Sequence, residues 1–133
     1  MSDDTNSFED NLMTSQWLNL ERNIRKTVMK EINSIIKEFK VEVRKLYGKR
    51  LKDIILYGSY ARGEATDDSD IDMAVVLEGD ISPGREIDRM IDIITEMNLK
   101  HNILISIYPV SEIDYLTLKS PLLMNVRKEG API

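Results

Sequence analysis

Two short apolar runs that flank a glycine-serine turn constrain the fold of this chain more than any other feature. The first run, residues 54–57, stops at Gly58-Ser59, and the second, residues 71–77, starts within an Asp-x-Asp pattern at residues 70–72. Both runs have the length and the apolar, β-branched character of buried strands. Because the residues between them are too few for a helical crossover of ordinary length, a doubly wound parallel sheet is excluded. The sequence therefore predicts a first strand over residues 52–57 and a second over 71–77 in a small mixed sheet.

Helical patterns lie on both sides of these strands in the sequence. Apolar residues that recur every three or four positions from Leu20 to Leu46 predict one long helix that ends at Gly48. A weaker repeat from Phe8 to Leu20 predicts either a separate first helix or an extension of the long one. Serine-proline start signals and further apolar runs indicate the later elements, which are a helix from Ser82-Pro83, a strand over 103–110, a helical piece from residue 111 and a last helix over 120–130.

The order of these elements predicts an α+β fold. We expect a mixed sheet of three or four strands with helices on one face, preceded by a long N-terminal helix. On this interpretation residues 1–133 form a single domain, with a helical extension over 1–48 and the core over 50–133.

The composition is that of an ordinary cytoplasmic protein. The chain has 133 residues, no cysteine and a formal net charge of −5, and no apolar run reaches the length of a membrane span. Disulfides and thiolate metal sites are therefore excluded, and we expect no membrane partner. The acidic balance argues against broad nucleic-acid binding. One basic cluster is either a solvated helix end or a local funnel for a polyanionic substrate, and it consists of Arg44, Lys45, Lys49, Arg50 and Lys52.

The Asp-x-Asp pattern is the strongest candidate for a functional site. In a strand, alternate side chains share a face, so the carboxylates of Asp70 and Asp72 point the same way. Two carboxylates this close repel each other unless a cation lies between them, and a divalent metal ion suits such a pair. The turn at Gly58-Ser59, between a strand and a helix, suits a phosphate group. Together these features predict a site for a metal ion and a phosphorylated ligand.

Two familiar loop motifs fit the same stretch poorly. Gly58 and Gly63 have the spacing of a nucleotide-binding P-loop, but Glu64 and Ala65 stand where a lysine and a hydroxyl residue are required. A calcium-binding loop over 68–79 fits its first three ligand positions but lacks the required glycine and the bidentate glutamate. Both interpretations are rejected.

A third motif fits without a gap. Over residues 58–72 the chain has Gly-Ser, ten residues and then Asp-x-Asp, which resembles the hallmark of the polymerase-β-like nucleotidyltransferases. The runs over 61–64 and 69–72 are similar to the family as well, and residues 121–130 resemble the closing helix of its small members. The resemblance covers residues 50–130. Within the family the chain is most similar to the minimal nucleotidyltransferases, which are short cytoplasmic proteins often encoded as antitoxin partners of HEPN-domain toxins.

This resemblance implies a reaction and a set of site residues. The reaction is the in-line attack of a hydroxyl on the α-phosphate of a nucleoside triphosphate such as ATP, with Mg²⁺ as cofactor and pyrophosphate as leaving group. Asp70 and Asp72 would be the catalytic, metal-binding carboxylates. The residues implied for nucleotide binding are Gly58, Ser59, Arg62 and Ser69. An ion pair is an equally good role for Arg62, and its acidic neighbours are Glu64, Asp67 and Asp68.

One position departs from the family pattern. Fully active members carry a third carboxylate on a later strand, and strand alternation assigns Ser106 to that position here. Serine neither binds a metal as a carboxylate does nor acts as a base near neutral pH. Two functions therefore stay open: an enzyme that transfers a nucleoside monophosphate to a hydroxyl of a partner such as a HEPN-type toxin, and a catalytically degenerate binding module that masks a partner protein. The oligomeric state is also open, and His101, the single histidine, is predicted to be a surface residue rather than a base.

Overall fold

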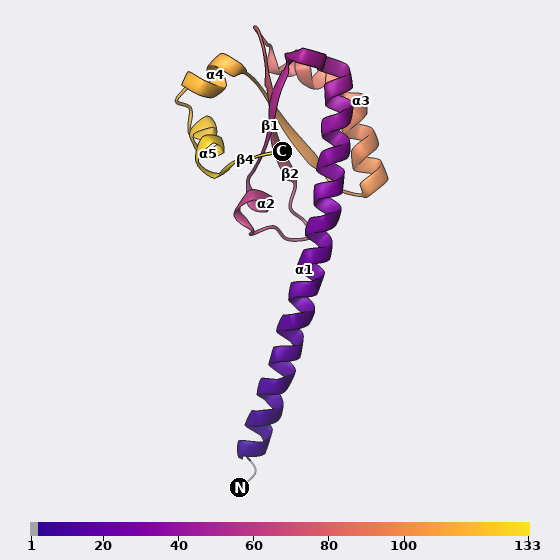
Figure 1. Ribbon diagram of the computed structural model, residues 1–133, viewed down its shortest axis with the longest axis vertical. Coiled ribbons are helices and arrows are strands. Elements are labelled where there is room, and N and C mark those ends of the chain that lie inside the picture. Colours follow the sequence, from indigo (N-terminus) through magenta and orange to yellow (C-terminus); the bar gives the residue numbers. More distant parts are fainter. Residues whose placement is uncertain (1–2) are drawn as a thin grey trace. The chain divides into compact units, whose positions relative to one another are not determined.

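The chain folds as a long helix followed by a mixed sheet with further helices (Figure 1). The structure is a computed structural model that describes residues 3–133, with side chains from residue 14 onward. The chain falls into two compact units, one that ends at Ser34 and one over Ile35–Ile133, and all the strands belong to the second. In chain order the elements are α1 (Asp3–Tyr47), the 3₁₀ turn η1 (Gly48–Arg50), β1 (Leu51–Tyr57), α2 (Ser59–Arg62), β2 (Ile71–Leu77), α3 (Pro83–His101), β3 (Ile105–Ser111), α4 (Glu112–Thr117), α5 (Pro121–Glu129) and β4 (Ala131–Pro132).

The predicted long N-terminal helix is confirmed as α1. Because α1 is continuous over its whole range, the weaker apolar repeat before Leu20 extends the long helix and does not form a separate one. The helix ends directly before Gly48, which has φ of 58°. Glycine adopts this left-handed conformation at no steric cost, which is why it ends helices so often. Among the described residues, no helix combines the length and the apolar character that crossing a membrane requires.

Four strands form one sheet in the order β3-β2-β1-β4. β1 is antiparallel to both β2 and β4, whereas β2 and β3 are parallel and are joined through α3. A parallel pair needs a crossover of this length, while the antiparallel β1 and β2 need only the short segment between them. The predicted α+β fold with a mixed sheet is confirmed, and the two-residue strand β4 makes the number of strands four.

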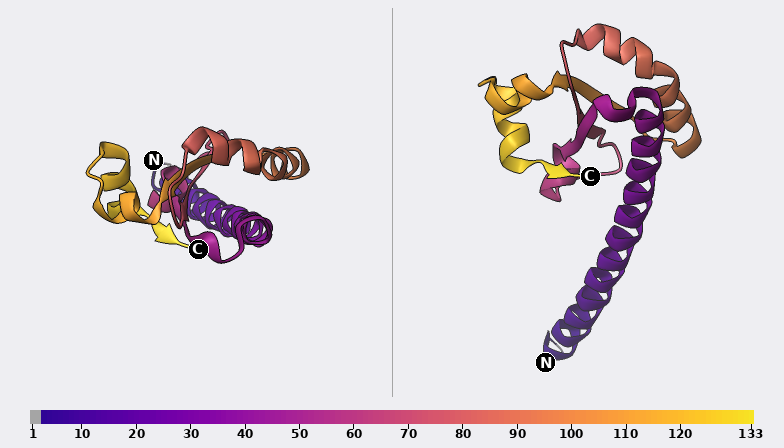
Figure 2. Two further views of the ribbon diagram at one scale, coloured as in Figure 1. Left: turned by 90° about the horizontal axis from the view of Figure 1, so that it is seen from above. Right: turned by 45° about the horizontal axis from the view of Figure 1, so that its top comes forward.

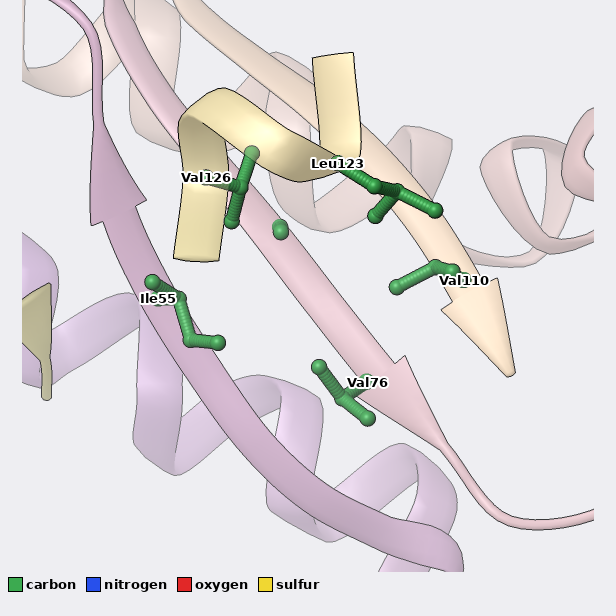
Figure 3. Close-up of a cluster of buried hydrophobic side chains, with 6 residues drawn as sticks. Ile55, Val76, Val110, Leu123 and Val126 are labelled. Atoms are coloured by element: carbon green, nitrogen blue, oxygen red, sulfur yellow. The ribbon is translucent and has the colours of Figure 1, made fainter. Parts of the chain in front are cut away.

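Helices cover both faces of this sheet (Figure 2). On one face, Ile55, Val76 and Val110 of the strands pack against Leu123 and Val126 of α5 (Figure 3). On the other face lie α3 and the part of α1 from residue 35 onward. Their apolar side chains, with the strand residues that point the same way, exclude water from the second half of the core.

The expectation of helices on one face only is therefore wrong. Successive residues of β2, such as Met73 and Ala74, are fully buried although they point to opposite faces, and the same holds for Ile54 and Ile55 of β1. Strands that are apolar on both faces need cover on both. The short helix α5 provides that cover on the face that the prediction left open.

The direction of the strands brings the two halves of the Gly-Ser and Asp-x-Asp pattern together. Because β1 and β2 are antiparallel, Tyr57 at the end of β1 pairs with Asp72 near the start of β2. In the parallel pair, Asp72 lies beside Ser106 of β3. The glycine-serine turn, the two aspartates and the third-strand serine thus gather at one end of the sheet.

Candidate functional site

The two aspartates of the Asp-x-Asp pattern lie close together at the start of β2. Asp72 is half-buried within the strand, and Asp70 is exposed just before it. Burial raises the pKa of the Asp72 carboxyl above its ordinary value, the negative charge of Asp70 raises it further, and Arg62 opposes both effects. The two carboxylates therefore repel each other, and a bound cation would relieve that repulsion. Within the described part of the chain, no third histidine, cysteine or acidic residue joins them to form a larger metal-ligand group.

Gly58 lies directly against Asp72. Its backbone has φ of 75° and ψ of −154°, a conformation that only glycine adopts readily. A Cβ atom at this position would lie 2.3 Å from Oδ2 of Asp72. A glycine is therefore needed at this position for the end of β1 to approach Asp72 so closely, with or without a ligand.

The residues after Gly58 form the single turn α2. Ser59 is half-buried at its start, and within the described residues its hydroxyl has no side-chain hydrogen bond. The turn ends at Gly63, which has φ of 71°. The Ser59 hydroxyl is therefore available to a ligand at the turn that follows Gly58.

Arg62 is paired with two carboxylates. Its Nε donates to Glu64 at 3.0 Å, as one of the two predicted roles for this residue requires. Its Nη1 donates to both oxygens of Glu129, at 3.1 and 3.2 Å, and Gly58 N–H donates to Glu129 Oε1 at 3.2 Å. The prediction named Glu64 among the partners of Arg62 but missed Glu129. The resemblance of residues 121–130 to the closing helix of small family members was the one available signal, and it carried no information about where that helix packs.

Ser69 shapes the loop before the aspartates. Its Oγ accepts a hydrogen bond from the Thr66 backbone N–H at 2.8 Å and lies 3.3 Å from Thr66 Oγ1. This local turn leads the chain into Asp70. A role for Ser69 in nucleotide binding stays a prediction.

No carboxylate occupies the third position on the later strand. Ser106 is exposed on β3, and its Cα pairs with that of Asp72, as alternation along the strand requires. Asp53 pairs with Val76, further along β2, and accepts a hydrogen bond from the N–H of its neighbour Ile54 at 2.9 Å. Asp53 is thus at the wrong end of the sheet to replace the missing carboxylate.

His101 ends α3 and pairs with an acidic residue of α1. Its Nε2 lies 2.9 Å from Oε2 of Glu38, whose other oxygen accepts a hydrogen bond from Lys100 at 2.6 Å. The histidine is half-buried rather than fully on the surface, and its contact stabilises the packing of α3 against α1.

Comparison with known proteins gives the geometry a context. "Putative protein adenylyltransferase MJ0141" of Methanocaldococcus jannaschii is 34% identical to this chain over 103 residues, which cover 77% of the chain and 99% of that relative. "Putative protein adenylyltransferase MJ0604" of the same organism is 43% identical over 77 residues, covering 58% of the chain and 71% of the relative. "Protein adenylyltransferase MntA" of Thermococcus cleftensis is 46% identical over 50 residues, covering 38% of the chain and 48% of the relative.

A solved structure supports the same fold. The chain described as "Crystal structure of the toxin-antitoxin with AMP-PNP" superposes with a TM-score of 0.52, covering 71% of this chain and 69% of that one at 17% identity. The family model described as "Nucleotidyltransferase domain" matches residues 36–128, which contain the whole Gly-Ser and Asp-x-Asp pattern. The resemblance seen in the sequence is thereby confirmed, and this chain belongs to the nucleotidyltransferase domain family.

Proposed function

We propose that this chain is a cytoplasmic nucleotidyltransferase that transfers the monophosphate of a nucleoside triphosphate, by preference ATP, to a hydroxyl of a partner protein. The observation that carries the proposal is the placement of Asp70 and Asp72 against the turn at Gly58-Ser59. Two carboxylates that repel each other suit a divalent cation, and the glycine-serine turn packed against Asp72 suits a phosphate group. In the reaction the hydroxyl oxygen forms a bond to the α-phosphorus and gives up its proton to solvent water, while the bond from the α-phosphorus to the bridging oxygen breaks and pyrophosphate leaves.

Each predicted site residue has a role in this proposal. Asp70 and Asp72 would hold Mg²⁺, which when bound neutralises negative charge on the triphosphate. Gly58 lets the backbone approach the ligand, and Ser59 donates its hydroxyl to a phosphate oxygen. Arg62 supplies positive charge to the phosphates, and the turn made by Ser69 orients the loop that carries Asp70.

A partner protein is the acceptor that the relatives favour. Three of them carry the name protein adenylyltransferase, and the solved structural neighbour is a toxin-antitoxin complex with AMP-PNP. We therefore propose a toxin of the HEPN type as the partner, with a tyrosine or serine hydroxyl as the acceptor.

The test is labelling of co-purified partner protein with ATP that is radioactive at the α-phosphate. The double variant Asp70→Asn and Asp72→Asn is expected to lose labelling. The double variant Asp67→Asn and Asp68→Asn is a matched control, because it removes the same charge from two exposed residues of the preceding loop. Equal labelling by the wild type and the Asp70/Asp72 variant would refute the proposed function.

The position of Ser106 favours a second candidate, a binding module that retains the nucleotide site without turnover. On this alternative, calorimetry detects Mg-ATP binding to the wild type although no label is transferred. Replacing Ser106 with aspartate would add a carboxylate beside Asp72, and a positioned general base contributes about 10²-fold or more to a reaction rate. Turnover by Ser106→Asp, but not by the similarly shaped and neutral Ser106→Asn, would favour the binding module as the natural function. High turnover by the wild type would exclude it.

A further inference from the structure

The carboxylate of Glu129 is bound to the hydrogen-bond donors that an anionic ligand of this site would need. It is the last residue of α5, and its carboxylate accepts hydrogen bonds from Gly58 N–H at 3.2 Å and from Arg62 Nη1 at 3.1 and 3.2 Å. A backbone N–H and a guanidinium that converge on one carboxylate form an anion site. This site lies at the turn where the proposed function locates the triphosphate.

The chain after Glu129 holds its carboxylate in place. A Cβ atom on Gly130 would lie 2.5 Å from Cγ2 of Ile55 and 2.3 Å from the carbonyl oxygen of Val126, so glycine alone lets the chain leave α5 flush against β1. The strand β4 then pairs with β1, and Ile133 N–H donates to the carbonyl oxygen of Ile54 at 2.9 Å. Since Gly58 follows β1 directly, this pairing fixes Glu129 beside it.

We propose that Glu129 is an internal stand-in for the triphosphate. Its carboxylate occupies the anion site formed by Gly58 N–H and Arg62, and a nucleotide that binds there displaces it. The inference rests on the proposed function, since it names the ligand that takes the place of Glu129. A carboxylate and a phosphate group cannot share the same donors, because their negative charges repel each other at that distance. The apparent affinity is therefore the intrinsic affinity multiplied by the fraction of molecules in which Glu129 has left the site.

A role for Glu129 as the missing third metal ligand predicts the opposite effect. Its oxygens already accept hydrogen bonds from Arg62 and Gly58, so the guanidinium of Arg62 matches its charge without a metal ion. If it nevertheless bound the metal, removing its charge would weaken the binding of a metal-nucleotide complex. The sign of the change in affinity thus separates the two roles.

Displacement of Glu129 would also loosen the C-terminal strand. Because Glu129 directly precedes Gly130 and β4, its departure from the site weakens the pairing of β4 with β1, which consists of only two residue pairs. This coupling is reciprocal: if nucleotide binding weakens the pairing of β4 with β1 by some factor, loss of that pairing raises the affinity for the nucleotide by the same factor.

The test compares the wild type with Glu129→Gln in the full chain. Glutamine keeps the length and the acceptor oxygen of glutamate but loses its charge, so the fold is preserved. Glu96→Gln, an exposed residue of α3, is the control for the same change in net charge. Calorimetry measures the dissociation constants for inorganic pyrophosphate and for Mg-ATP. Hydrogen exchange of the Ile133 amide, with and without Mg-ATP, reports on β4.

We expect Glu129→Gln to bind both probes about five- to tenfold more tightly than the wild type and Glu96→Gln to match the wild type. We also expect Mg-ATP to accelerate exchange of the Ile133 amide in the wild type. Unchanged or weaker binding by Glu129→Gln would overturn the inference and leave the proposed function standing. Tighter pyrophosphate binding without any Mg-ATP binding would retain Glu129 as the occupant of the anion site and would remove the proposed function.

Discussion

Replacing Gly58 with alanine tests the geometry of the site most directly. The new methyl group would lie 2.3 Å from Oδ2 of Asp72 and 3.2 and 3.3 Å from its Cγ and Cβ, so the whole aspartate side chain has to move. Overpacking of this kind costs about 1–3 kcal/mol. The backbone conformation, with φ of 75° and ψ of −154°, costs a residue with a Cβ a further 1–3 kcal/mol or so. We therefore expect Gly58→Ala to lower the free energy of unfolding by about 2–6 kcal/mol, a large share of the stability of a typical domain.

Two other glycines serve as matched controls. Gly63 also has positive φ, at 71°, but a Cβ there would meet nothing within 4 Å, so Gly63→Ala carries only the backbone cost of about 1–2 kcal/mol. Gly84 lies in the first turn of α3 with open space around it, so Gly84→Ala is expected to stabilise the protein by about 0.4–1 kcal/mol, because alanine has less conformational freedom to lose on folding. Asp72→Ala removes the carboxylate and leaves only the Cβ contact at 3.3 Å, so it should remove most of the steric part of the cost of Gly58→Ala.

The assay is urea denaturation followed by circular dichroism, with the free energy of unfolding of each variant extrapolated to water. From the most to the least stable, the expected order of the free energies of unfolding is Gly84→Ala, wild type, Gly63→Ala and Gly58→Ala. If Gly58→Ala were no less stable than Gly63→Ala, or if Asp72→Ala did not reduce its cost, the close contact between Gly58 and Asp72 would be refuted.

Three further predictions concern the core and the titratable groups. Phe39→Ala, at a fully buried position, should lower the free energy of unfolding by about 3–5 kcal/mol in the same urea assay, and a loss below 1 kcal/mol would contradict its burial. Hydrogen bonds from Lys100 and His101 lower the pKa of the Glu38 carboxyl below its ordinary value of 4.5, so the ionised carboxylate stabilises the fold above that value and loses this effect as the pH falls through the folded pKa. The difference in the free energy of unfolding between the wild type and Glu38→Gln should therefore shrink on acidification. A difference that does not depend on pH would refute this prediction. Burial, with the charge of Asp72, raises the pKa of the Tyr57 hydroxyl to about 12, so the unfolded chain loses this proton at a lower pH than the folded chain. The free energy of unfolding of the wild type should therefore fall between roughly pH 10 and pH 12 more steeply than that of Tyr57→Phe.

Most of the secondary structure could be predicted because its signals are local. The apolar run at 54–57 is the last part of β1, and the run at 71–77 is the whole of β2. The serine-proline signals mark the starts of α3 and α5. The third strand was predicted to begin at residue 103 and begins at Ile105, since Asn102 takes the left-handed conformation that ends α3. The two-residue strand β4 had no pattern of its own and forms only because the edge of β1 is available to it.

The cover on the sheet was predicted less well. An apolar strand residue indicates burial but not which helix buries it, and alternation assigns residues to two faces without saying what lies above each. The helix α5 contributes few apolar side chains, and its place over Ile55, Val76 and Val110 depends on contacts between residues far apart in the chain. Helices on both faces were therefore visible only in three dimensions.

By itself, the sequence determined the local chemistry of the site: a glycine-serine turn, two carboxylates one residue apart, and a serine on the later strand that aligns with them. These features depend on spacing within strands and turns, which local backbone geometry sets. Only the tertiary structure decided what surrounds them, because Glu129 reaches Gly58 and Arg62 through the packing of α5 and the pairing of β4 with β1. Those contacts join residues that are 71 and 67 positions apart. Hydrophobic burial and strand pairing bring together residues this far apart in the sequence and leave no periodic signal in it. The anion site and the carboxylate that occupies it are therefore visible only in the folded chain.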